Sequence, residues 1–174
     1  GRINWVPTLS VDATATPASI CTGGASQLNA NVTGGLGPFT YLWSPSGSLS
    51  DPASSQPVAS PSVTTTYSVV VTDALGSSAT DQVTVTVNPL LPVSVSIVAS
   101  ANPVPTGTFV TFTATPVNGG AIPAYQWLVN GIPVGSGLST YSYPPANNDQ
   151  VWCSLTSSEP CVSGNPATSN IMEM

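Results

Sequence analysis

The chain has 174 residues and a formal net charge of −6, and only 5% of its residues are charged, where about a quarter is usual. Its single basic side chain is Arg2, and it contains no Lys or His. Nucleic acids and anionic membranes are bound through Lys and Arg, so the composition argues against both as partners. No apolar run approaches the roughly 20 residues of a membrane-spanning helix.

The first predicted element is an extended strand over residues 1–13. Apolar side chains and Gly fall on odd positions and most polar ones on even positions, which is the alternation of a half-buried strand. This pattern is roughly twice the length of an ordinary strand of about 5–6 residues. We predict that residues 1–10 are an N-terminal extension strand, a candidate donor to a neighbouring subunit. The side chains that would carry this contact are Ile3, Trp5, Leu9 and Val11.

Two other interpretations of the extension remain open. It could be a disordered end, as termini often are, or it could lengthen an edge of its own domain. The low charge of the chain favours donation, because lone β domains protect their sheet edges with charged residues.

Further strand patterns follow at regular spacing, and no window has the helical period of 3.6. Clusters of Gly, Pro, Asn and Asp separate them and predict turns. Short strands at this spacing are typical of an all-β sandwich or barrel. The clearest strand patterns are residues 67–73, 81–87, 92–98, 108–115 and 125–129.

The two halves of the chain also match each other. Residues 28–43 parallel residues 112–127, with Trp43 and Trp127 at the same place in a Tyr-x-Trp pair. The first half carries YLWSP (41–45), TTTYSVVVTD (64–73) and VTVTV (83–87). The second half carries ANPVPTGTFVTFTATP (101–116), YQWLVNG (125–131), CSLTS (153–157) and GNPATSN (164–170). Both halves resemble the immunoglobulin-like repeats, including the PKD-like type, of secreted and surface proteins of Bacteroidota-type bacteria.

The resemblance implies two tandem immunoglobulin-like β-sandwiches, residues 11–88 and 93–174, joined by a Pro-rich linker at 89–92. It implies that Trp43 and Trp127 fill the two cores.

Three more positions follow from the same resemblance. Tyr67 is expected to act as a tyrosine corner. Leu28 and Phe112 stand where antibody domains have the partner cysteine, so apolar packing is expected to replace the inter-sheet disulfide. The resemblance also implies an extracellular or cell-surface location.

Cys153 and Cys161 are separated by seven residues, a spacing that suits a disulfide across a hairpin. We predict this bridge, with two buried free thiols as the alternative. Cys21 is then left over, as a small buried apolar residue or as a link to another chain. A zinc site is not expected, because the chain has no His and no CxxC pair.

The residues of the common catalytic sites are missing. Without His and Lys, the usual general bases and Schiff-base nucleophiles are absent, so we predict a non-enzyme with no cofactor. Asp73 and Asp81 flank one hairpin and could hold calcium, but Asp is typical of turns through its local backbone hydrogen bonds.

Two surface residues are further candidates for contacts. Trp152 alternates with Val151 and Cys153, which are expected in the core, so its side chain is expected to point outward. It would then anchor an interface, stack on a sugar, or be a half-covered surface residue. Asn31 begins an Asn-x-Thr sequon and is a candidate glycosylation site, although Asn31 and Thr33 could simply end a strand.

The function that these observations favour is a structural subunit of an extracellular filament, which polymerises head-to-tail with other copies of itself through the N-terminal strand. The last strand, within residues 167–174, is shorter than in related repeats and would leave backbone groups for a donated strand. The alternative is a binding or spacer module of an adhesin that recognises a glycan or a protein.

Overall fold

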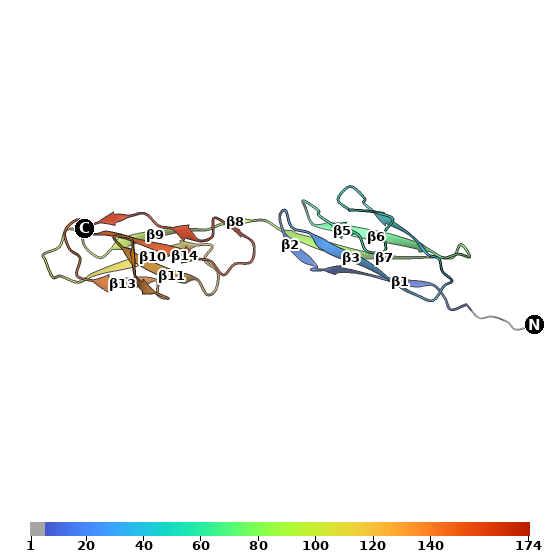
Figure 1. The fold of residues 1–174 in the computed structure, drawn as a ribbon, viewed down its shortest axis with the longest axis horizontal. Helices are drawn as coiled ribbons and strands as arrows, with labels where there is room; N and C mark the ends of the chain where they lie inside the picture. The colour runs from blue at the N-terminus through green and yellow to red at the C-terminus, as the bar shows by residue number, and fades with distance from the viewer. Residues whose placement is uncertain (1–5) are drawn as a thin grey trace, which may run out of the picture. The chain divides into compact units, whose positions relative to one another are not determined.

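The computed structural model describes residues 6–174, and all of their regular elements are β-strands (Figure 1). The chain divides into two compact units, unit 1 up to Pro89 and unit 2 over Leu90–Met174. The predicted all-β fold of two immunoglobulin-like sandwiches is confirmed. No helix among the described residues is long and apolar enough to cross a membrane.

Unit 1 contains one three-stranded and one four-stranded sheet. The first sheet has the order β1 (Ser10–Thr16), β3 (Ser26–Thr33), β5 (Val58–Ala59). The second has the order β2 (Ser19–Cys21), β7 (Ser78–Asn88), β6 (Thr65–Thr72), β4 (Thr40–Ser44). All pairs are antiparallel except β2 and β7, which run parallel.

Unit 2 repeats this plan. One sheet has the order β13 (Thr140–Tyr143), β10 (Val110–Val117), β9 (Ser94–Ala99). The other has the order β12 (Ile132–Ser136), β11 (Ala124–Val129), β14 (Gln150–Thr156), β16 (Ala167–Thr168), with β17 (Met172–Glu173) also paired to β14. A small parallel pair joins β8 (Leu91–Pro92) to β15 (Val162–Ser163).

Each unit encloses its own apolar core around one tryptophan. Trp43 and Trp127 are both 1% exposed, as predicted, because the strand alternation turns them inward between the two sheets. Each indole N–H donates to the carbonyl of the residue 11 positions later, Ser54 or Leu138, at 3.0 Å. The same polar contact in both halves supports the internal repeat at the level of side chains.

The residues around the tryptophans also repeat. Leu28 and Phe112 are 0% exposed, as expected for the positions that replace a cysteine. Tyr67 is fully buried, and its hydroxyl lies 2.6 Å from the Ser48 hydroxyl. The predicted tyrosine corner therefore bonds to a side chain and not to the backbone.

The first strand of unit 1 changes sheets at Pro17. Residues before it, in β1, pair with β3, and residues after it, in β2, pair with β7. Proline has no N–H for a ladder, so a strand is readily interrupted at this residue. In unit 2, Pro103 follows β9 in the same place.

Candidate functional site

Leu9 and Val11 belong to their own unit. Both are 9% exposed, and Val11 is part of the core cluster of unit 1. The Gly35 N–H donates to the Pro7 carbonyl oxygen at 2.9 Å, which fixes the chain just before Leu9. The expectation that Leu9 and Val11 fill pockets in another subunit is therefore wrong, because their own sandwich already covers them. Ile3 and Trp5 lie outside the described residues.

Gly34 makes this attachment possible. Its φ is +68°, and a Cβ at this position would collide with the Thr8 carbonyl oxygen. Only glycine tolerates both the left-handed backbone and the close approach of the N-terminal segment.

Gly34→Ala is expected to detach residues 7–9 from unit 1 and to lower its stability by at least about 1–2 kcal/mol, the cost of a left-handed L-residue. The measurement is hydrogen exchange at the Gly35 amide, which should lose protection, combined with urea denaturation. Gly47→Ala is the control, since no atom lies within 4 Å of a Cβ there and its φ is not positive. Unchanged protection at Gly35 would contradict the assignment.

Asp73 organises the turn beside this segment. It is 6% exposed and accepts N–H bonds from Leu36 at 3.3 Å and from Leu75 and Ser77 at 2.9 Å. It is therefore a turn residue, as predicted. A hollow of about 320 Å³ lies next to it, lined by Val6, Pro7, Thr8, Leu9, Asp73, Leu75, Ser77 and Ser78.

Asp81 lies on β7 and reaches across to the edge strand β1. One of its carboxylate oxygens accepts the Ala13 N–H at 2.7 Å, and this bond is the main reason that the pKa of Asp81 is lowered. A carboxylate at a sheet edge satisfies an open N–H and also repels another strand. Within residues 6–174, no three Asp, Glu, Cys or His residues are grouped so that they could hold a metal ion.

Trp152 lies on the outer face of its sheet, as predicted. Val151 and Cys153 on either side are 0% exposed, whereas Trp152 is half-buried beside its cross-strand partner Leu128. The far end of its ring lies near Gly131, where a Cβ would be 3.9 Å from the ring. The residue is therefore a half-buried side chain on the surface of unit 2.

Asn31 is exposed on β3, so its side chain faces solvent as a glycosylation acceptor requires. Its amide oxygen accepts from Asn29 at 2.8 Å, and its amide nitrogen donates to Asp12 at 3.5 Å. Glycosylation of Asn31 stays a prediction.

The cysteine prediction is wrong. Cys153 is a free thiol with 0% exposure, whereas Cys161 is disulfide-bonded, so these two do not form the expected bridge. The place beside Cys153 is taken by Ser169, whose N–H donates to the Cys153 carbonyl at 2.9 Å and whose hydroxyl accepts the Cys153 N–H at 2.9 Å. Cys21 is also disulfide-bonded and half-buried, and is not the small buried apolar residue that we expected.

Cys153 is expected to be unreactive in the folded protein, because burial raises the pKa of its thiol to about 11. A thiol reagent such as DTNB at pH 8 should find no thiol in the native chain. It should find one after denaturation, and all three only after reduction. A Cys153→Ala variant, which should show none before reduction, is the control. Three thiols in the unreduced, denatured chain would contradict the bonded state of Cys21 and Cys161.

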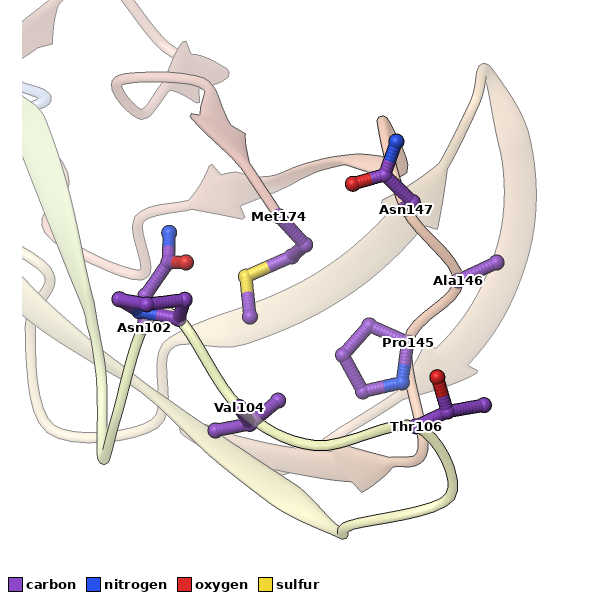
Figure 2. Close-up of a pocket in the computed structure, with 8 residues that line it drawn as sticks. Asn102, Val104, Thr106, Pro145, Ala146, Asn147 and Met174 are labelled. Atoms are coloured by element: carbon purple, nitrogen blue, oxygen red, sulfur yellow. The ribbon is translucent and has the colours of Figure 1, made fainter.

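A second hollow, of about 130 Å³, lies in unit 2 at the end of the last strand (Figure 2). The Met174 N–H donates to the Asp149 carbonyl at 3.0 Å, and the Met174 carbonyl accepts the Asn148 N–H at 2.7 Å. Asn102 donates from its side chain to the Glu173 carbonyl at 2.8 Å. These bonds fix the two sides of the hollow. Its lining residues are Asn102, Pro103, Val104, Thr106, Pro145, Ala146, Asn147 and Met174.

The Asp149 carboxylate holds the loop on one side of this hollow. It accepts from the Ala146 N–H at 2.8 Å, from the Asn130 amide at 2.8 Å and from the Tyr143 hydroxyl at 3.1 Å. Burial alone would raise the pKa of Asp149, but these hydrogen bonds outweigh it and hold the pKa below its usual range. Burial, followed by the bond to Asp149, raises the pKa of Tyr143.

The sequence did not identify these lining residues as a site. The loop residues Pro145 to Asn147 had no motif of their own.

A decoration protein of Escherichia phage T5 is 42% identical to this chain in an alignment of 91 positions, which covers 49% of this chain and 54% of the phage protein. The chain thus spans about half the length of this curated relative. No family model matches the chain.

Two solved structures are similar to this chain, and the one with a TM-score above 0.5 supports the fold. A chain of a 1.5-MDa bacterial ice-binding adhesin is 17% identical, with a TM-score of 0.52 over 95% of this chain and 62% of that chain. The three N-terminal domains of the highly immunogenic outer capsid protein Hoc of bacteriophage RB49 are 14% identical, with a TM-score of 0.42 over 95% of this chain and 58% of that chain.

Proposed function

We propose that this chain is a non-catalytic, immunoglobulin-like module displayed on the outside of a larger assembly, where it has a structural or binding role. The observation that carries the proposal is the 42% identity over 91 residues to a phage decoration protein. A surface of Ser, Thr, Asn and Gly with few charges suits a module that faces solvent on a particle or a cell.

The side-chain chemistry supports the non-catalytic part of this proposal. Three carboxylates accept hydrogen bonds from backbone N–H groups of their own unit, namely those of Asp73, Asp81 and Asp149. No buried side-chain nitrogen or oxygen in residues 6–174 lacks a hydrogen-bond partner. Acid groups held in this way stabilise turns and edges and do not converge on a common cleft. Trp152 is the residue that we expect at a contact with a glycan or a protein.

The test is immunogold labelling of the intact phage particles or cells that carry the chain. The antibodies are raised against the purified protein. Gold on the outside, without permeabilisation, is the expected result. An antibody against an internal protein serves as the control and should label only after lysis. Labelling that requires lysis would overturn the proposal.

We infer a second candidate function from one observation in the sequence, the alternation of Ile3 and Trp5 with polar residues in the N-terminal segment. In this form, the module polymerises head-to-tail with other copies of itself through residues 1–5. Electron microscopy of the purified chain should then show filaments that grow with protein concentration and disappear when residues 1–5 are deleted. A chain that stays monomeric at every concentration would contradict this second function.

A further inference from the structure

One row of side chains on the outer face of unit 2 is apolar across four neighbouring strand positions. Pro133 of β12 pairs with Leu128 of β11, and Leu128 pairs with Trp152 of β14. The register of β17 with β14 places Ile171 opposite Trp152, one residue beyond the last pair of these two strands. Neighbouring strands lie about 4.8 Å apart, so the row is about 14 Å long. We call these four residues the apolar row.

The apolar row lies at the surface of unit 2. Ile171 is 59% exposed, and Pro133 is exposed as well. Leu128 and Trp152 are half-buried. Single apolar side chains are common at a protein surface, but a continuous patch that contains a Trp is typical of a contact with another molecule.

The corresponding row of unit 1 is polar, so the fold does not require the apolar row. Alignment of the two units on their core tryptophans matches this row with Ser44, Ser68 and Gln82, which pair with one another across β4, β6 and β7. Ser44 and Gln82 are exposed, and Ser68 is half-buried. Because both units build the same sheet, we infer that the apolar side chains of unit 2 serve a contact and not folding.

The rows on either side of the apolar row are polar and nearly uncharged. Gln126, Ser154 and Thr168 form the row on one side, and Gln150 pairs with Glu173 on the other side. Glu173 is the one charged side chain among these five residues. An apolar centre with a polar rim is the usual composition of a protein–protein interface.

We propose that the apolar row is a contact between two copies of this chain, which pack face to face around a two-fold axis. The axis runs parallel to the strands, between β11 and β14. It places Trp152 of one copy on Leu128 of the second copy, and Ile171 on Pro133. Two bulkier side chains thus meet two smaller ones, and each contact occurs twice, as in any isologous pair. The row is therefore complementary to itself.

Charge supports the choice of a second copy. Glu173 lies at one edge of the face, and the two-fold axis puts its counterpart at the opposite edge. Three strand spacings across the sheet and about 10 Å between packed faces set the two carboxylates roughly 17 Å apart. This distance exceeds the Debye length of about 8 Å at physiological ionic strength, so their repulsion is largely screened.

Other occupants fit this face less well. A single carboxylate offers little attraction to a basic protein surface. A sugar ring would stack on Trp152 but would leave the aliphatic side chains of the row in water. Both remain possible results of the experiment below.

The contact is small. Four strands at about 4.8 Å and about six residues at 3.3 Å each give a face of roughly 400 Å². A standard interface buries about 800 Å² per partner, so we expect a weak dimer, with a dissociation constant on the order of 0.1–1 mM. On an assembly that carries several copies, the high local concentration would favour the same contact. The inference thus deepens the proposed function and rests on it for the role of the contact there, whereas the contact itself is measurable in solution.

The first experiment changes one residue of the apolar row at a time in the full chain. Trp152→Glu and Ile171→Glu each place a carboxylate in the contact, and the exposed position of Ile171 leaves the core of unit 2 intact. Leu42→Glu is the matched control, because Leu42 is 62% exposed on the corresponding face of unit 1, where it pairs with half-buried Val70. Sedimentation velocity over a concentration series up to about 2 mM should show a dimer of the unaltered chain and of the Leu42→Glu variant. The two row variants should dimerise at least tenfold more weakly.

A second measurement locates the contact. Amide NMR spectra of the unaltered chain are recorded over the same concentration series. The signals of Leu128 and Trp152 should shift as the dimer forms, while those of Ser44 and Ser68 stay in place. Association through residues 1–5 would instead persist in the Ile171→Glu variant.

Each outcome decides the proposal. A chain that stays monomeric at every concentration overturns the second copy as the occupant and leaves the face to another protein or to a glycan. Equal dimerisation of the unaltered chain and both row variants overturns the row as the contact, and so does an equal loss in the Leu42→Glu variant. Neither result bears on display at the surface of an assembly, which immunogold labelling tests separately.

Discussion

Replacement of Trp127 by Ala is expected to unfold unit 2. The indole is 1% exposed and packs 6.3 Å from the Phe112 ring and 6.1 Å from the Tyr141 ring, measured between centroids. Removal of a buried Trp costs about 3–5 kcal/mol through lost burial and the cavity left behind. It would also leave the Leu138 carbonyl without its N–H donor. This loss reaches the lower end of the stability of a small domain, which is about 5–15 kcal/mol.

The measurement is chemical denaturation with hydrogen exchange on the full chain. Amides in β14 should lose protection, while those of β6 in unit 1 keep it, because each unit has a core of its own. Trp152→Ala is the matched control, since it removes an indole from the outer face and should cost far less. Trp43→Ala should reverse the pattern and unfold unit 1. Equal loss of protection in both units would contradict independent cores.

Asp73→Ala is expected to destabilise unit 1 by about 3 kcal/mol, since hydrogen bonds to charged groups contribute about 1.5–3 kcal/mol each. The carboxylate is 6% exposed and accepts three backbone N–H bonds, which Ala cannot replace. The three backbone amides that donate to Asp73, those of Leu36, Leu75 and Ser77, would then bond to water or stay unpaired in a partly buried turn. Urea denaturation and hydrogen exchange at these amides provide the measurement.

Asp51→Ala is the control for this substitution. Asp51 also accepts a backbone N–H, from Ala53 at 2.9 Å, but it lies on an exposed loop where water can take its place. We expect its effect to stay below about 1 kcal/mol, as for an ordinary exposed hydrogen bond. Equal losses of unfolding free energy in the two variants would show that the hydrogen bonds to buried Asp73 stabilise unit 1 no more than an exposed hydrogen bond does. The Asp73 turn also lies beside residues 6–9, so its loss should loosen the attachment of these residues to unit 1.

The sequence by itself determined the fold class and the two cores. Strand alternation is a local property with a period of two, and it decides which side chains face inward without knowledge of distant contacts. The resemblance to immunoglobulin-like repeats implied that Trp43, Trp127, Leu28 and Phe112 lie in the cores, and all four are buried. The outward position of Trp152 followed from the strand alternation.

Only the tertiary structure decided the state of the cysteines and the placement of residues 6–9. Cys153 and Cys161 have a suitable spacing, but the register of β14 turns Cys153 into the core and brings Ser169 beside it. The sequence pattern predicts that Leu9 is a donor residue. The structure shows instead that the backbone at Thr8 packs closely against Gly34 of its own unit. Both results depend on residues far apart in sequence, whose pairing is fixed by register and close approach and not by any local pattern.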